Sequence, residues 1–315
     1  MFLRRMTIVA AVTAMLLTSL FPHPADAGEA TTPGGFIAYQ SLREGRWRIV
    51  RMNSDGSGKV LLPGNGNNTY PVWLPSGRIL FNSDRSGMWK VYSMAANGTA
   101  VRLVAGGSVP MEHAGVGGDG RLLLVRIGLR SFRIRNLATG EVKPVSFASF
   151  PGTGGEFWPA LSPDGGKIAF LFKNGGVAQR AVYAAPITEE TTRYTVGPAT
   201  LVAVGCFNSW AADSSRFLMC IITNEAEGSN LYLATKGQGG LWTKTRVTAA
   251  VNWDYFPAWS PDNSWIVWAA SPVENHPFES ATYEIYAKPA AGGALVRLTK
   301  DAYADNAPSW SAPVP

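Results

Sequence analysis

The chain has 315 residues, of which 46% are hydrophobic, and its 28 Lys and Arg against 22 Asp and Glu give a net charge of +6. This mild basic excess contains no cluster dense enough to indicate a nucleic-acid partner. With 3 His and 2 Cys in all, a zinc site built on several imidazoles or thiolates is excluded.

The first 27 residues have the pattern of a secretory signal peptide. Arg4 and Arg5 form a basic start, residues 8–21 form an apolar stretch of 14 residues, and Ala25-Asp26-Ala27 is a small-x-small cleavage site. Such a stretch is too short to span a bilayer comfortably. We therefore expect a secreted or periplasmic protein, no transmembrane segment after cleavage, and a mature region of residues 28–315.

The mature region opens with three segments that predict strands, at residues 36–39, 47–52 and 59–62. After them a phrase recurs: a large apolar residue that is usually Trp and in four copies follows two positions after a proline, then a turn resembling Ser-Pro-Asp-Gly, then a hydrophobic run. Proline presets the first dihedral of that turn, Asp bonds its own backbone, and Gly accepts a positive φ. The anchor residues of the six copies are Trp73, Val116, Leu161, Trp210, Trp259 and Trp310, with intervals of 43, 45, 49, 49 and 51.

A repeat of this period indicates stacked supersecondary units. Each unit predicts four short antiparallel strands, and no helical periodicity persists. The last copy, at 308–311, stops before its partner strand, whereas the N-terminal segments supply a second, third and fourth strand without a first. We therefore predict an all-β, six-bladed β-propeller whose C-terminal strand completes the N-terminal blade and closes the ring.

At this point the chain resembles the TolB-like propeller family. The likeness lies in Pro-Ala-Trp-Ser-Pro-Asp at 257–262, Ser-Asp-Arg-x-Gly at 83–87 and Arg-Leu-Thr at 297–299, and it covers essentially the whole mature region. The resemblance implies a six-bladed, secreted propeller that binds proteins in the periplasm at one face. The chain departs from TolB in having only a few residues, and no α/β domain, between the cleavage site and the first strand.

Cys206 and Cys220 flank a predicted hairpin whose turn is centred near Asp213. Since the two are equidistant from that turn, they lie opposite each other on neighbouring strands, within reach of a disulfide. An oxidising compartment favours the bond, and two buried free thiols are the alternative.

The loops before the motif prolines are the candidate site. An amide or acid recurs three residues before the proline, and aromatic residues crowd the same loops. These groups form either a ligand-binding rim around the channel or a set of braces between blades. A third interpretation places a hard cation such as calcium on Glu156, Asp254 and Asp305. The candidate rim residues are Asn68, Tyr70, Glu112, His113, Glu156, Trp158, Trp253, Asp254, Tyr255, Tyr303 and Asp305.

We expect a monomeric, non-enzymatic binding propeller without a cofactor, which presents one face to a protein or cell-envelope ligand. Two alternatives remain open. The first is an enzyme that processes carbohydrates or lactones with a cation held by Glu156, Asp254 and Asp305. The second is a polysaccharide-binding module that uses the rim aromatics, with a glycan as its partner.

Overall fold

The computed structural model describes residues 32–106, 108, 110–117, 121–126, 131–148, 157–173, 180–224, 228–249, 252–272 and 283–313, all within the compact unit Thr31–Pro315. Their regular elements are β-strands, apart from one 3-10 turn at Gln238–Gly240. No helix in this part of the chain is long and apolar enough to cross a membrane. The all-β prediction is confirmed, and the predicted signal peptide lies outside the described residues.

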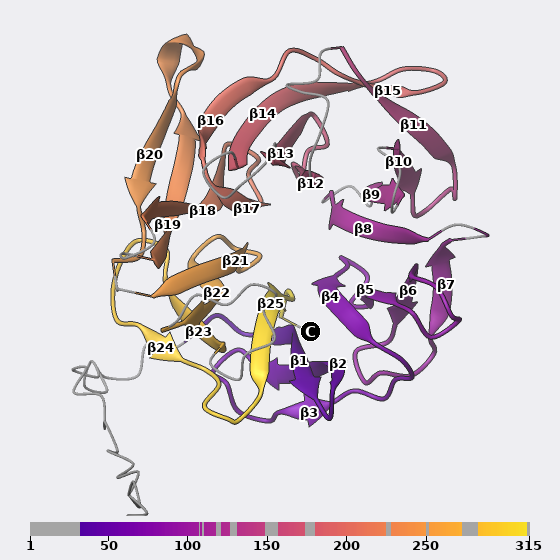
Figure 1. The fold of residues 1–315 in the computed structure, drawn as a ribbon, viewed down its shortest axis with the longest axis vertical. Helices are drawn as coiled ribbons and strands as arrows, with labels where there is room; N and C mark the ends of the chain where they lie inside the picture. Colours follow the sequence, from indigo (N-terminus) through magenta and orange to yellow (C-terminus); the bar gives the residue numbers. More distant parts are fainter. Residues whose placement is uncertain are drawn as a thin grey trace, which may run out of the picture. The chain divides into compact units, whose positions relative to one another are not determined.

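The strands follow one another in chain order, mostly as antiparallel neighbours (Figure 1). Two separate four-stranded sheets have the orders β25-β1-β2-β3 and β4-β5-β6-β7. Their strands are β1 (Phe36–Arg43), β2 (Arg46–Asn53), β3 (Val60–Leu61), β4 (Asn68–Trp73), β5 (Ile79–Ser83), β6 (Lys90–Met94), β7 (Arg102–Ala105) and β25 (Ala304–Trp310).

A nine-stranded sheet holds the next two groups of strands. Its strands are β8 (Met111–Val116), β9 (Arg121–Arg126), β10 (Ser131–Asn136), β11 (Val142–Phe147), β12 (Phe157–Leu161), β13 (Lys167–Lys173), β14 (Arg180–Glu189), β15 (Tyr194–Val196) and β16 (Thr200–Val204).

An eight-stranded sheet holds the remaining strands. They are β17 (Cys206–Trp210), β18 (Arg216–Asn224), β19 (Gly228–Lys236), β20 (Trp242–Arg246), β21 (Trp253–Trp259), β22 (Trp265–Ser271), β23 (Glu284–Pro289) and β24 (Val296–Arg297).

Strand β25 pairs antiparallel with β1, so that Ile37 lies opposite Trp310 and Leu42 opposite Ala304. This is the pairing that the truncated last copy of the motif predicts. It places β1 inside a sheet, between β25 and β2, where both of its edges are hydrogen-bonded.

The nine-stranded sheet contains a feature that the repeat does not predict. The end of β14 forms a short hairpin with β15, and β15 then pairs in parallel with β11. Glu189 stabilises this hairpin through two salt bridges: its carboxylate lies 2.6 Å from Lys143 Nζ and 3.6 Å from an Arg121 nitrogen. The hairpin covers an edge of β11 and joins two groups of strands into one sheet.

The core lies between the faces of successive groups of strands. One buried cluster brings Val182 of β14 and Val202 of β16 against Trp210 of β17 and Phe217 of β18. Burial of these side chains between sheets is the main term that holds neighbouring groups together.

The recurring motif builds lateral contacts between these groups. Trp210 Nε1 donates to the Ala160 carbonyl at 3.0 Å, and Trp259 Nε1 donates to the Ser209 carbonyl at 3.1 Å. Each indole therefore links the strand that carries one copy of the motif to the strand that carries the preceding copy. Trp210 and Trp259 are structural residues, since each ring is buried and each indole N–H is satisfied by the neighbouring strand.

A disulfide joins Cys206 of β17 to Cys220 of β18, with a Cα–Cα distance of 5.1 Å. The two residues face each other in the strand register, as the sequence spacing predicts. Both are buried, so the bond crosses the ladder within the protein interior.

Candidate functional site

The strands that carry the motif, β4, β8, β12, β17, β21 and β25, are here called the motif strands. Figure 1 shows these strands arranged around a common centre. Residues from every motif strand line one cavity of ≈ 280 Å³, here called the central cavity. Most wall residues are apolar, with prolines at the same motif position in four strands. The wall comprises Tyr70, Pro71, Val72, Asn82, Glu112, Gly115, Val116, Pro159, Ala160, Leu161, Pro163, Ser209, Trp210, Phe256, Pro257, Ala258, Ala307, Pro308 and Ser309.

A β-bulge places the residue before the motif proline in this wall. Tyr70, Phe256 and Ala307 adopt φ values of 50, 53 and 50°, in the left-handed region that non-glycine residues rarely use. The pairing register shifts at each of these places. Strained backbone repeated at one cavity is typical of a functional site.

The rings of Tyr70 and Phe256 are neighbours in the cavity wall although 186 positions separate them in the chain. Their centroids are 6.2 Å apart and their planes are tilted by 58°. Burial and then the nearby Glu112 charge raise the pKa of the Tyr70 hydroxyl, so it stays protonated at physiological pH.

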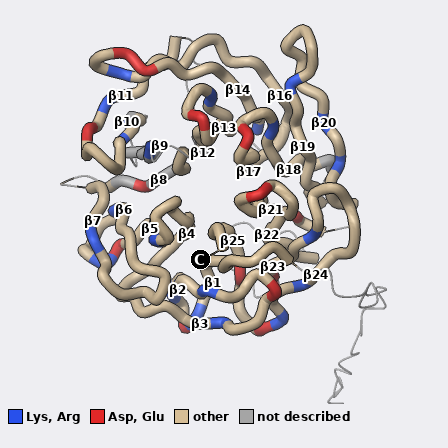
Figure 2. Tube along the Cα trace, turned by 180° about the vertical axis from the view of Figure 1, so that it is seen from behind, with Lys and Arg blue, Asp and Glu red and all other residues tan. Residues whose placement is uncertain are grey.

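Glu112 is the carboxylate of the described cavity wall. Its side chain is half-buried, and burial raises the pKa of its carboxyl above the ordinary value. Neither Lys nor Arg occurs in any motif strand, whereas Figure 2 shows these cations on outer strands such as β7 and β20. The cavity therefore has a negative group and no compensating positive one among its described wall residues.

Two of the eleven predicted rim residues, Tyr70 and Glu112, line the central cavity. Most of the others lie outside its wall. Asn68 is buried, and its Oδ1 accepts a hydrogen bond of 2.8 Å from Arg85. Trp253 and Tyr255 are buried and stack on each other, with centroids 6.3 Å apart. Tyr303 lies at the surface, 36% exposed, beneath the Arg43 guanidinium.

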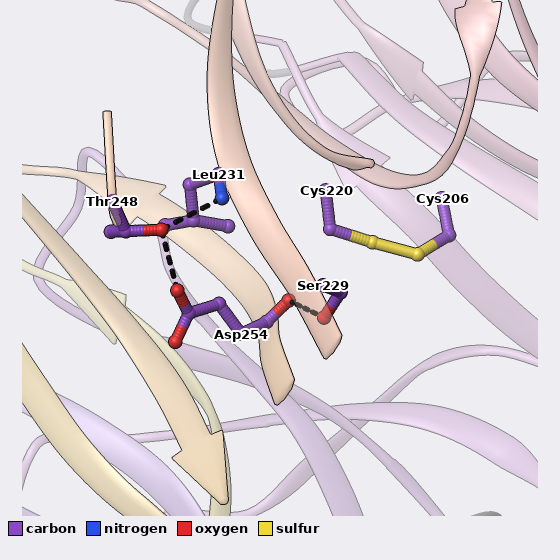
Figure 3. Close-up of a disulfide and its surroundings, with 6 residues drawn as sticks. All are labelled: Cys206, Cys220, Ser229, Leu231, Thr248 and Asp254. Carbon is purple, nitrogen blue, oxygen red and sulfur yellow. Dashed lines mark hydrogen bonds between the residues drawn. A yellow bond between two sulfur atoms is a disulfide. The ribbon is translucent and has the colours of Figure 1, made fainter. Parts of the chain in front are cut away.

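Asp254 is a brace within the fold rather than a member of the cavity wall. Figure 3 shows its carboxylate bonded to the Thr248 hydroxyl, which in turn accepts the N–H of Leu231 on β19. Trp268 Nε1 donates to the other carboxylate oxygen at 3.0 Å. Burial raises the pKa of Asp254 to about 7 in spite of these two bonds.

Asp305 is also fully buried, but within the described ranges neither of its carboxylate oxygens has a hydrogen-bond partner of normal geometry. Ser41 faces it across the β1–β25 ladder, and the Ser41 hydroxyl acts to lower the pKa of Asp305. Burial and the negative charges of Asp301 and Glu284 outweigh that effect and raise the pKa of Asp305 to about 7. Together with Asp254, this acid lies away from the described cavity wall.

The remaining predicted residues lie partly or wholly outside the described part. Glu156 is one of these, as are the side chains of His113 on β8 and Trp158 on β12. Among the residues that the structure describes, no group of three or more His, Cys, Asp or Glu side chains is arranged to hold a metal ion.

Phe256 is a wall residue that the set of candidate rim residues leaves out, although the set includes its neighbours Asp254 and Tyr255. In a regular strand, Asp254 and Phe256 would share a face because side chains alternate. The bulge at Phe256 and Pro257 breaks the alternation, so Phe256 reaches the cavity and Asp254 does not. An aromatic residue before a proline does not by itself predict the bulge, because Pro159 of β12 pairs with Phe170 in regular register.

No family model matches the chain, and no curated protein matches it. Among solved structures, TolB from Acinetobacter baumannii is similar over 89% of this chain and 67% of its own length, with 15% identity and a TM-score of 0.66. A chain of a nidogen/laminin complex is similar over 89% of this chain and 100% of its own length, with 6% identity and a TM-score of 0.59. The chain thus has a TolB-like β-propeller fold.

Proposed function

We propose that this β-propeller is an exported, non-enzymatic binding protein whose ligand, a protein or another cell-envelope component, binds in the central cavity. In this proposal the fold has six four-stranded blades, and the pairing of β25 with β1 closes the ring. The observation that carries the proposal is the cavity itself, to which all motif strands contribute.

The wall has the composition of a recognition site. Ligand pockets in proteins are mostly apolar, with a few polar groups that fix orientation. Here prolines, Ala258 and Phe256 supply the apolar surface, whereas Glu112, Ser209 and Ser309 supply polar groups. Strained residues at the bulges hold the aromatic part of the wall in place before any ligand arrives.

Export is supported by the Cys206–Cys220 disulfide, since such bonds persist in oxidising compartments. The predicted signal peptide points the same way. Binding is favoured over cation-dependent catalysis because Asp254 and Asp305, two of the three expected ligands, are enclosed outside the cavity wall.

Site-specific photo-crosslinking in the native host tests this proposal. Benzoylphenylalanine at position 256 replaces one aromatic residue of the cavity wall with another. The matched control carries benzoylphenylalanine in place of Leu241, a surface residue that is 74% exposed. We expect one specific adduct from position 256 and none of that adduct from 241. Equal yields from both positions would exclude the cavity as the binding site, and a stoichiometric divalent ion in the purified protein would favour the enzyme instead.

A further inference from the structure

We propose that the central cavity binds one organic cation, an alkylammonium group held by the Glu112 carboxylate against the faces of the Tyr70 and Phe256 rings. This inference rests on the proposed function, in that it takes the central cavity as the binding site, and it names the chemistry that the site selects.

The first reason is the state of Glu112. Its carboxylate lies half-buried in a mostly apolar wall, and it makes no hydrogen bond or ion pair with any residue that the structure describes. Removing a carboxylate from water is costly unless an opposite charge or hydrogen bonds compensate it. A cation that enters the cavity supplies the missing charge.

The second reason is the field around the cavity. The charged residues of the motif strands are Glu112, Asp254 and Asp305, and none of these strands carries Lys or Arg. Burial holds the pKa of Asp254 and Asp305 near 7, so these two are partly charged at neutral pH and add to the negative potential. Figure 2 shows Lys and Arg residues along outer strands such as β7 and β20. An anionic ligand would meet repulsion here, whereas a cation is attracted.

The third reason is the pair of rings. The face of an aromatic ring attracts a cation, and aromatic walls are the usual recognition element for alkylated ammonium groups. Tyr70 and Phe256 are tilted against each other at 6.2 Å, a geometry that forms a corner rather than a closed stack. Their left-handed backbone fixes both rings at corresponding positions of β4 and β21.

The size of the cavity limits the ligand. Pockets for drug-sized ligands have about 300–1,000 Å³, and this one has ≈ 280 Å³. A single alkylammonium group with a short stem suits that volume. It can belong to a free amine such as choline or to the lysine side chain of a protein partner, which share the chemistry that Glu112 and the rings recognise.

Calorimetric titration of the full chain tests the proposal with three probes: choline, its uncharged isostere in which carbon replaces the ammonium nitrogen, and N-acetyl-lysine methylamide. We expect at least one of the two cations to bind about tenfold or more tightly than the isostere. Choline as the tighter probe indicates a free amine, and the lysine derivative as the tighter probe indicates a protein side chain. Failure of both cations to bind, or equal binding of the isostere, overturns the proposal.

Variants assign the effect to the named groups. Glu112→Gln should weaken cation binding about tenfold or more, and Phe256→Leu about threefold to thirtyfold. Glu112→Asp keeps the charge and should retain part of the affinity, while Glu44→Gln, the same charge change at an exposed turn, should leave it unaltered. An unaltered affinity in a folded Glu112→Gln protein overturns the cation assignment. Crosslinking from position 256 is independent of this result, so the proposed function can stand when the cation fails.

Discussion

Asp254 and Asp305 occupy the same place in two successive repeats, six residues after a threonine and five residues before the motif tryptophan, but their surroundings differ. In the first repeat, the Thr248 hydroxyl donates to Asp254 and Trp268 Nε1 donates to its other oxygen. In the second, both oxygens of Asp305 lack a partner of normal geometry in the described structure.

The difference originates in the threonine. Thr299 accepts the N–H of Ile285 as Thr248 accepts that of Leu231, but Thr299 donates its single proton to Glu284. Position 230 of the earlier repeat, which corresponds to Glu284, is Asn. Because a hydroxyl has only one proton, a carboxylate on β23 takes the bond that Asp305 would otherwise receive.

The partner across the ladder differs as well. Tyr39 stands in β1 where Trp268 stands in β22, and its buried hydroxyl has no hydrogen-bond partner among the residues that the structure describes. An acid that recurs at one repeat position is therefore a satisfied brace in one copy and an unsatisfied group in the next. Recurrence alone does not assign either residue to a ligand site.

Replacing each acid with alanine should give the largest difference in stability between the satisfied Asp254 and the unsatisfied Asp305. Asp254→Ala leaves the Thr248 hydroxyl and the Trp268 N–H without an acceptor, at a cost of about 1–3 kcal/mol for each orphaned group. Asp305→Ala breaks no comparable bond and should lie within about 1 kcal/mol of the wild type. Urea denaturation at pH 6 measures both, and equal losses would contradict the comparison.

The pH dependence of stability should reveal both acids. Burial raises their pKa from 3.8 to about 7 in the folded state, so the folded protein binds these protons more tightly than the unfolded chain. The tighter proton binding therefore stabilises the folded state fully below the pKa of the two carboxyls in the unfolded chain. This stabilisation is lost as the pH rises through their folded-state pKa of about 7. Between the unfolded-state and folded-state pKa values of Asp305, the free energy of unfolding falls as the pH rises. Asp305→Asn should make that slope shallower by up to about 1.4 kcal/mol per pH unit. Denaturation series for the wild type and Asp305→Asn check this, and parallel curves would contradict it.

Glu284 offers a way to convert the second repeat into the first. In Glu284→Ala, the Thr299 hydroxyl is free to turn to Asp305, so that Asp305→Ala should then become costlier by about 1 kcal/mol. A double-mutant cycle measures this coupling. The matched control is Asn230→Ala beside Asp254, where we expect no such coupling. A zero coupling between positions 284 and 305 would show that competition for the threonine proton is not the cause.

Several parts of the fold could be predicted because their causes are local. The turn at Ser162–Asp164 is stabilised by its own residues. The Ser162 hydroxyl donates a hydrogen bond to the Asp164 carboxylate and accepts one from the backbone N–H of Lys167. The cysteine pair follows from equal spacing about a turn. The cavity wall could not be predicted in the same way, because one bulge reverses which side chains face inward. Asp254 and Phe256 would share a face in a regular strand, but a two-residue irregularity separates them, and periodicity alone does not reveal it.

The smallest expected effect concerns the two aromatic partners of the acids. Trp268→Phe removes the donor to Asp254 Oδ1 and should cost about 1 kcal/mol beyond the change in buried area. Tyr39→Phe removes a buried hydroxyl that has no hydrogen-bond partner in the described part of the chain, so it should be neutral or stabilising. Both substitutions retain an aromatic ring, and thermal denaturation at matched pH measures them together. A clear loss of stability in Tyr39→Phe would mean that this hydroxyl has a partner in solution, and the contrast between the repeats would then disappear.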